Sequence, residues 1–228
     1  MWTAIRQAFE LLLSYDPTLL QIVAVTLQMS ISSSLVALLI GVPLGIFLAT
    51  WRSRLRSIPI VLNRTMMGLP PVVCGLFCYL MFCGVGPLRG LQLLYTVKGM
   101  VIAQIILITP IVAGNIEGYV SSIAQPVRET TKGLGLSRLK TLLLTVSECR
   151  YQVITVYLIA FGRAIAEVGA VSMVGGAIAF KTNVMTTAIM MYTNRGDFTL
   201  GIALGIILLL MFLVLNVIVG ILQARLSR

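Results

Sequence analysis

The sequence predicts an all-α membrane protein that consists of one transmembrane domain, residues 1–228, with five membrane-spanning helices. Its mean hydropathy is +1.01, and only 11% of its residues are charged, whereas soluble domains are about one quarter charged. Five apolar segments are each long enough for the ~20 residues that a spanning helix needs. They are residues 19–50, 58–85, 100–119, 151–179 and 200–223. This five-span core, residues 19–223, leaves no room for a separate soluble domain.

Before the first span, residues 1–15 predict a helix that lies in the membrane interface. Apolar residues recur there at helical spacing, as interfacial helices require: Trp2, Ile5, Phe9, Leu12 and Leu13. The segment also carries Glu10 and has no small-residue cleavage site after a short apolar core. We therefore expect no secretory signal peptide.

The net charge of +10 follows membrane topology, so we expect a lipid bilayer as partner and no nucleic acid. Cytoplasmic loops of membrane proteins carry an excess of Lys and Arg. The richer set of loops carries Arg52, Arg54, Arg56, Arg128, Lys132, Arg138, Lys140, Arg150, Arg225 and Arg228. The poorer set carries Arg6, Arg89, Lys98, Lys181 and Arg195. This asymmetry predicts an external N-terminus and a cytoplasmic C-terminus. Five spans require the two termini to lie on opposite sides, which agrees with this orientation.

The first span carries a stripe of small and hydroxylated residues. Thr26, Ser30 and Ser34 recur every four residues, and Gly41 and Gly45 continue the stripe. Such stripes let helix backbones approach closely, and hydroxyl groups can donate hydrogen bonds across the contact. The stripe is either the hydroxyl-lined face of a pathway for a hydrated anion, with Thr26 and Ser30 as candidate pathway residues, or a packing surface.

Paired prolines interrupt the second span. Pro70 and Pro71 break the helical hydrogen-bond ladder. Such a break can line a cavity on a transport pathway, or it can be a fixed kink that shapes the bundle. In the third span, Glu117 lies near the predicted cytoplasmic end, where we expect an interfacial carboxylate.

The fourth span carries two charged residues, Arg163 and Glu167, four positions apart. Residues at this spacing can face one another on a helix. Arg163 lies about 18 Å along the helix from Tyr151 at 1.5 Å per residue, close to the middle of the bilayer. Either charge alone would be costly there, so we expect an intramembrane charge pair. It lies on the transport route or the moving interface, or it is a buried ion pair that fixes helix packing.

Polar residues follow on the predicted outer side of the membrane. Ser172, Thr186 and Thr187 are further candidate pathway residues, and Lys181 adds a positive charge. A re-entrant helix here could attract an anion with its N–H groups. A solvated loop with an interfacial helix explains the composition equally well.

The residues that commonly carry catalysis are scarce. The four cysteines, Cys74, Cys78, Cys83 and Cys149, lie in apolar segments or on the predicted cytoplasmic side, which does not suggest a disulfide framework. The chain has no His, no phosphate-binding Gly-Lys loop and no nucleophile with a base. We predict no metal site, no bound cofactor and no enzymatic activity by this chain alone.

Residues 121–150 form a polar, basic segment between the third and fourth spans, and we predict that this segment is a cytoplasmic coupling loop. Its run Glu129-Thr130-Thr131-Lys132-Gly133-Leu134-Gly135 resembles the E-A-A-x3-G loop of ABC importer permeases. Thr130 and Thr131 stand where that loop has two alanines, a change that a docking helix should tolerate.

Two further runs resemble the oxyanion branch of these permeases. Phe161-x-Arg163-Ala164-x-x-Glu167-x-Gly169 matches a pattern shared by that branch, and Gly68-Leu69-Pro70-Pro71-Val72-Val73 is similar to the proline pair of its second span. The chain thus resembles a type I ABC importer permease (MetI-like fold) of the molybdate, sulfate and tungstate branch over nearly its whole length. Glu148-Cys149-Arg150-Tyr151 is more similar to tungstate-type permeases than to the Leu-Pro of molybdate-type ones.

The resemblance implies a membrane subunit that works with other chains. Two copies would form a homodimer around a tungstate pathway in a bacterial or archaeal cytoplasmic (inner) membrane. Each copy would contact one of two cytoplasmic ATPase subunits, which bind the ATP and Mg, and an extracytoplasmic binding protein would deliver tungstate. The coupling loop would dock on the ATPase through Arg128, Glu129, Thr130, Thr131, Gly133, Gly135, Leu136 and Ser137.

Other cargoes and roles fit the same residues. Molybdate and sulfate are tetrahedral dianions like tungstate, so the sequence does not separate them by physical chemistry. The five-span core and the loop would also suit a permease for another small solute, such as an amino acid. A membrane assembly subunit that transports nothing is a further alternative.

Overall fold

The computed structural model describes residues 6, 10, 17–51, 53 and 55–226. The elements assigned in this part of the chain are all helical, as expected. They are α2 (Pro17–Thr50), α3 (Ser57–Met67), α4 (Pro71–Phe82), the 3₁₀ turn η1 (Arg89–Leu91), α5 (Val97–Gly133), α6 (Arg138–Glu148), α7 (Arg150–Ile165), α8 (Gly169–Gly175), α9 (Met185–Asn194) and α10 (Phe198–Leu226). The interfacial helix predicted for residues 1–15 lies almost entirely outside the described residues.

The predicted spans differ in how straight they are. In the described part of the chain, α2, α5 and α10 are each long and apolar enough to cross a membrane. The segment predicted as the second span is instead two helices, α3 and α4, bent by 96°, and the fourth is α7 and α8, bent by 56°. The five predicted spans are therefore three long helices and two bent pairs.

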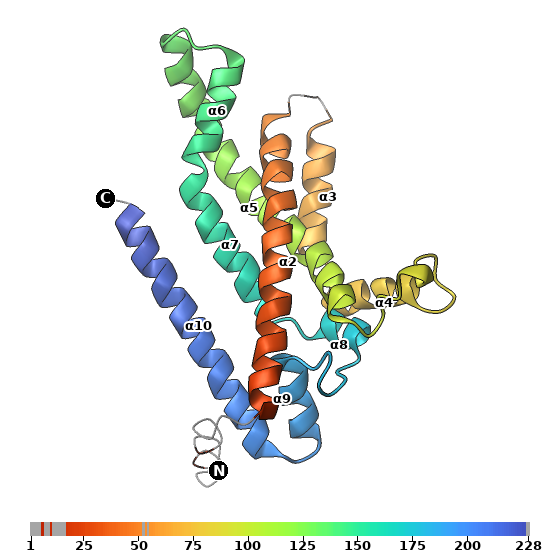
Figure 1. Cartoon of the computed structure of the whole chain (residues 1–228). Coiled ribbons are helices and arrows are strands. Elements are labelled where there is room, and N and C mark those ends of the chain that lie inside the picture. The colour runs from red at the N-terminus through yellow and green to blue at the C-terminus, as the bar shows by residue number, and fades with distance from the viewer. Residues whose placement is uncertain (1–5, 7–9, 11–16, 52, 54, 227–228) are drawn as a thin grey trace.

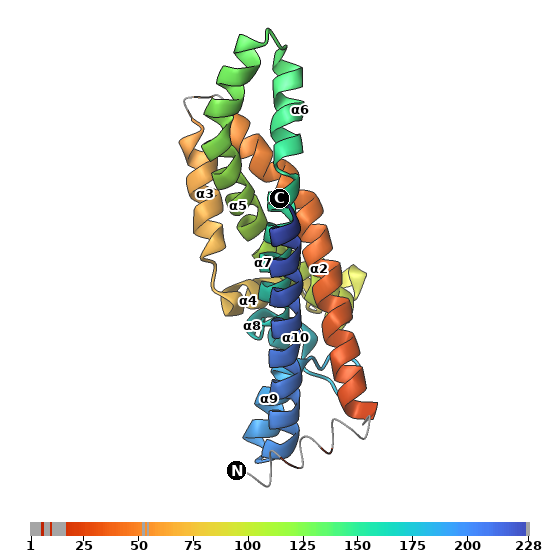
Figure 2. The ribbon, with the colours of Figure 1, turned by 90° about the vertical axis from the view of Figure 1, so that its left-hand side faces the viewer.

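The helices are arranged lengthwise, with different elements at the two ends (Figure 1). α5 and α6 extend past the ends of α2 and α3 at one end of the molecule, and α9 lies at the opposite end. The view turned by 90° shows the same projection of the α5–α6 pair (Figure 2). The third predicted span, residues 100–119, is part of a longer helix, because α5 continues through Pro110 and Pro126 to Gly133.

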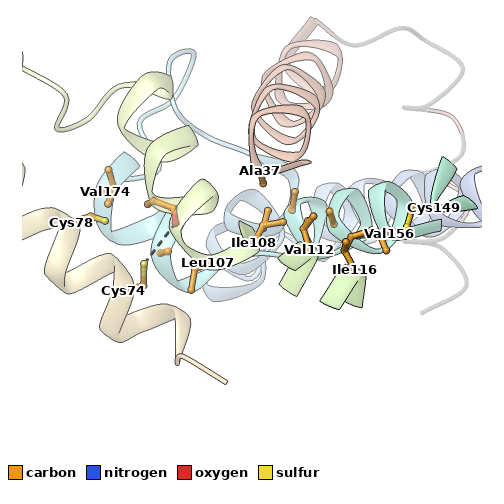
Figure 3. Packing of buried hydrophobic residues seen from close by; sticks show 14 of the residues in the cluster. Ala37, Cys74, Cys78, Leu107, Ile108, Val112, Ile116, Cys149, Val156 and Val174 are labelled. Atoms are coloured by element: carbon orange, nitrogen blue, oxygen red, sulfur yellow. Dashed lines mark hydrogen bonds between the residues drawn. The ribbon is translucent and has the colours of Figure 1, made fainter. Parts of the chain in front are cut away.

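Close packing of α2 on α5 forms the centre of the fold. A Cβ atom at Gly45 would lie 2.5 Å from the carbonyl oxygen of Ala113, and one at Gly41 would lie 2.7 Å from Val112 Cβ. The absence of a side chain at both positions lets the backbones approach, as the small-residue stripe predicts. Figure 3 shows part of the surrounding core, with Cys74 and Cys78 of α4 at one end of the cluster and Cys149 at the other.

Candidate functional site

The predicted coupling segment, residues 121–150, is a helical hairpin over most of its length. The last turns of α5 carry Arg128, Glu129 and Thr130, and α6 runs back from the tip. All three side chains are exposed, and the Glu129 carboxylate accepts a hydrogen bond of 2.9 Å from Gln125 Nε2. An exposed carboxylate therefore lies near the tip of a hairpin that projects beyond the other helices (Figure 1).

The turn at the tip depends on a glycine and on three hydroxyl groups. Gly135 has φ +65°, a left-handed conformation that favours glycine over residues with a Cβ. Thr131 is buried, and its hydroxyl oxygen accepts a 3.1 Å hydrogen bond from Thr141 Oγ1, which joins α5 to α6. Ser137 accepts a hydrogen bond from Lys140 N and so caps α6. These contacts fix the shape of the tip.

The hairpin also exposes apolar side chains. Leu134 is 69% exposed and Leu143 is 58% exposed, Leu136 is half-buried, and the space beside Gly133 is open. Exposed apolar groups that gather next to polar ones are typical of a surface on which another protein binds.

Arg163 and Glu167 form the expected charge pair. Arg163 Nη1 donates a 2.7 Å hydrogen bond to Glu167 Oε2, and the Glu167 side chain is only 4% exposed whereas that of Arg163 is 34% exposed. The other carboxylate oxygen of Glu167 accepts from the backbone N–H of Ala170, at the start of α8. The Glu167 carbonyl accepts a 2.8 Å bond from Thr186 Oγ1. Glu167 therefore holds α7, α8 and the start of α9 together.

The candidate hydroxyl groups of the first span lie inside the chain. Thr26 is fully buried, and its hydroxyl donates to the Ile22 carbonyl and accepts from the backbone N–H of Met185. Ser30 is also fully buried, and its hydroxyl has no partner among the described residues. These positions fit the packing interpretation, because both side chains are buried within the chain and the Thr26 hydroxyl joins α2 to the start of α9.

The candidate residues on the predicted outer side are likewise used within the fold. Thr187 is buried and donates to Asn183 Oδ1 and to the Val184 carbonyl. The half-buried Ser172 donates to the Gly169 carbonyl. Their hydroxyl groups thus stabilise α8 and the start of α9.

The proline pair lies at the break between α3 and α4. Pro70 is extended, with ψ 128°, and Pro71 is the first residue of α4. A Cβ atom at Gly169 would lie 3.3 Å from Pro71 Cβ and 2.9 Å from Val72 Cγ2. The break therefore lies against the start of α8, close to Glu167 in the chain.

Two polar contacts between distant segments were not predicted. Glu117, expected as an interfacial carboxylate, is buried at 5% exposure and approached by Arg56 and Arg64. Ser33 Oγ donates a 2.6 Å hydrogen bond to Gln104 Oε1, and Gln104 Nε2 donates to the Ala164 carbonyl. The sequence shows that these side chains are polar, but it does not show which of them pair, because the partners are more than 50 positions apart in the chain.

The four cysteines are free thiols. Cys74 and Cys78 lie one turn apart on α4, where both are buried, and Cys74 Sγ lies 3.7 Å from the Ala103 carbonyl oxygen. Burial raises the pKa of the Cys149 thiol, and the nearby Glu148 carboxylate raises it further. Within the described residues, no group of three His, Cys, Asp or Glu side chains is placed to hold a metal ion.

Comparison with known proteins identifies relatives along nearly the whole chain. Residues 41–228 match the family described as binding-protein-dependent transport system inner membrane component. The chain is 34% identical to the tungstate uptake system permease protein TupB of Peptoclostridium acidaminophilum, over 96% of each chain. It is 36% identical to a probable anion ABC transporter permease protein of Haloferax volcanii, over 87% of this chain and 88% of that one.

A solved structure has the same fold. The chain superposes with a TM-score of 0.74 on a chain of the MetNI methionine ABC transporter in an inward-facing conformation. The match covers 91% of this chain and 95% of that one at 15% sequence identity. It confirms the predicted MetI-like fold.

Proposed function

The chain belongs to the family of binding-protein-dependent transport system inner membrane components and is an ABC importer permease, and on this basis we propose that it forms the membrane pathway of an ATP-driven tungstate importer. The observation that carries the proposal is the α5–α6 hairpin, which extends beyond the other helices and exposes Glu129 near its tip. A separate ATPase subunit binds ATP and Mg and docks on this tip. The chain itself is not catalytic.

The docking surface combines charge, apolar area and a fixed backbone. Glu129 and Arg128 supply exposed charges, and Leu134 supplies an exposed apolar contact. Because the tip is the end of α5, a displacement of the tip moves a helix that packs along α2 in the core. Such a rigid element can transmit a change between two global states.

Two copies of the chain form the pathway between them. α3 and α4 expose apolar side chains such as Val61, Val72 and Phe77, and a lipid or a second copy can cover these faces. The pathway runs from an extracytoplasmic binding protein to the cytoplasm, with the hairpin and the C-terminus on the cytoplasmic side. The candidate pathway hydroxyls of α2 are buried within one chain, which favours side chains outside this packing stripe as the pathway lining.

Tungstate is favoured as cargo because relatives described as tungstate uptake permeases are more similar to this chain than one described as a molybdenum transport permease. TupB proteins of Peptoclostridium acidaminophilum and Campylobacter jejuni are 34% and 35% identical to this chain. A molybdenum transport permease of Azotobacter vinelandii is 26% identical over 73% of this chain. Molybdate and sulfate are the nearest alternatives because they share the charge and shape of tungstate.

Elemental mass spectrometry of cells tests the cargo. Cells that lack the gene are compared with cells restored by the wild-type chain, at nanomolar supplied oxyanion. Loss of cellular tungsten alone supports the proposal, whereas loss of molybdenum or sulfur instead reassigns the cargo. Unchanged levels of all three elements would contradict oxyanion import.

Glu129→Lys tests the docking of the ATPase. We expect the variant chain to insert in the membrane at wild-type level but to lose most of the co-purified ATPase, because the reversed charge opposes the docked contact. Glu148→Lys is the matched control, since Glu148 is also exposed but lies at the other end of α6. Wild-type ATPase recovery and uptake in Glu129→Lys would remove this residue from the docking surface.

A further inference from the structure

A charge cluster around a buried carboxylate lies where α2, α3 and α5 meet. Glu117 of α5 has a side chain that is 6% exposed, and its two carboxylate oxygens lie 3.7 Å from Arg56 Nη2 and 3.6 Å from Arg64 Nη2. The two arginine side chains are themselves 38% and 68% exposed. Ser121 Oγ donates a 2.9 Å hydrogen bond to the same carboxylate. The two arginines come from segments more than 50 positions earlier in the chain, so the cluster joins parts of the fold that are far apart in sequence.

Arg56 extends the cluster to the end of α2. Its Nε donates a 3.2 Å hydrogen bond to the Leu48 carbonyl, and its Nη2 donates a 3.1 Å bond to Ser121 Oγ. A cation that binds the last carbonyl groups of a helix is favoured by the helix dipole. Arg56 therefore ties the C-terminus of α2 to the same region of α5.

Polar contacts on one face of α3 help to hold this helix against α5. Its apolar residues Ile58, Val61 and Leu62 are each 61% exposed, and in lipid such exposed surface provides no force that drives helices together. On the face toward α5, Asn63 Nδ2 donates to the Pro110 carbonyl, and Met67 packs against Gly114. The contact of Glu117 with Arg64 and Arg56 joins these two contacts in holding α3 against α5, at the position of α5 closest to the hairpin tip.

The cluster lies between the hairpin tip and the broken helix pair. Glu129 follows Glu117 by twelve residues on the same helix, about 18 Å at 1.5 Å per residue. On the other side, Arg64 precedes Pro70 by six residues, and beyond Pro70 the chain bends by 96° into α4. A movement of the tip therefore reaches the break through α5, the cluster and α3.

We propose that Glu117 is a positioning residue that couples the hairpin to the α3–α4 break. It holds Arg56 and Arg64 on α5, so that α3 moves with the hairpin and changes the break when the partner ATPase acts. This inference rests on the proposed function. Without the carboxylate, Asn63 and Met67 still hold α3 against α5, but the charged link closest to the hairpin is lost, and the tip can move while the break does not.

The test uses the whole complex, with its ATPase and binding protein, in lipid vesicles with tungstate as the probe. ATP hydrolysis and tungstate uptake are measured in the same sample, and the readout is uptake per ATP hydrolysed. For Glu117→Gln we expect wild-type recovery of the ATPase, hydrolysis within about twofold of wild type, and uptake per ATP reduced about tenfold, a size typical of coupling between sites. Arg64→Gln should act in the same direction, and Arg64→Lys should remain near wild type because it keeps the charge.

Thr65→Val is the matched control, because Thr65 is adjacent to Arg64 on α3 and its hydroxyl bonds to the Val61 carbonyl of its own helix. An unchanged uptake per ATP in Glu117→Gln, or an equal loss in Thr65→Val, would overturn the inference. If Glu117→Gln does not assemble, Arg64→Gln decides the matter, since Glu117 then retains Arg56 and Ser121. The proposed function fails separately, if the wild-type complex takes up none of tungstate, molybdate and sulfate.

Discussion

The two bent helix pairs pack against each other, yet different chemistry produces each bend. Between α3 and α4 the backbone itself breaks, because Pro71 has no N–H and Pro70 is extended. Between α7 and α8 there is no proline, and the side chain of Glu167 bridges the break by bonding to Arg163 and to the N–H of Ala170. The first bend is therefore set locally by residue type, and the second by side-chain contacts and packing.

We therefore expect the two bends to respond differently to substitution of the residues around them. A break caused by proline does not depend on its neighbours, whereas a bend held by one carboxylate depends on each group that the carboxylate binds. The contact between the pairs is also close, since a Cβ atom at Gly75 of α4 would lie 2.7 Å from Ala170 Cα. Three substitutions separate backbone, side chain and packing.

The largest effect is expected from Glu167→Ala. It removes a buried carboxylate and leaves Arg163 without its partner, which should lower the free energy of unfolding by about 2 to 3 kcal/mol, at the low end for a buried pair because Arg163 is one-third exposed. The free energy of unfolding in mixed detergent micelles measures this. Arg163→Met combined with Glu167→Leu should recover about half of the loss, since apolar replacements leave no unpaired charge. A loss below about 0.5 kcal/mol in the single variant would mean that packing, and not the contacts of the Glu167 carboxylate, sets the bend.

Gly75→Ala should destabilise somewhat less, by about 2 kcal/mol, because the added methyl group meets backbone atoms of α8 that cannot rotate away. The same unfolding measurement applies. Gly118→Ala is the control, since it lies in α5 with no atom within 4 Å of the added Cβ, and alanine there should be neutral or stabilising. Equal effects at both positions would show that the close contact between α4 and α8 does not matter.

The sequence predicts the first bend but not the mechanism of the second. Pro70 and Pro71 signal a break by residue type alone, and the spacing of Arg163 and Glu167 predicts their pairing. The bonds from Thr186 to the Glu167 carbonyl and from Ala170 to its side chain were not predicted, because they appear only once α7 is broken.

The same limit applies to the rest of the candidate site. The motif predicts where Glu129 lies and that it is accessible, since polar residues surround it. Ser30 and Thr26 illustrate the opposite case, because the rotation of α2 about its axis decides whether their hydroxyl groups line a pathway or pack, and rotation is not encoded in a stripe of residue types. Glu117 was predicted as an interfacial carboxylate, but its burial and its pairing with Arg56 and Arg64 were not, because the two arginines come from an earlier part of the chain.

The smallest effect is expected from Pro70→Ala, which tests whether this proline is needed for the bend between α3 and α4. Pro71 remains and disfavours a helical conformation at the residue before it, and α4 remains packed on α8, so the bend should persist. The free energy of unfolding should fall by about 0.5 kcal/mol, because the unfolded chain gains freedom.

The distance between two spin labels reports the geometry of the bend, with one label at Ile58→Cys, the other at the native Cys83, and the other three cysteines replaced. A straight helix would separate these positions by about 37 Å, whereas two arms at a right angle give about 26 Å. A shift to the longer distance in Pro70→Ala would mean that Pro70 alone maintains the break. If the bend persists instead, Pro70→Ala combined with Pro71→Ala tests whether the contact with α8 can hold the bend without either ring.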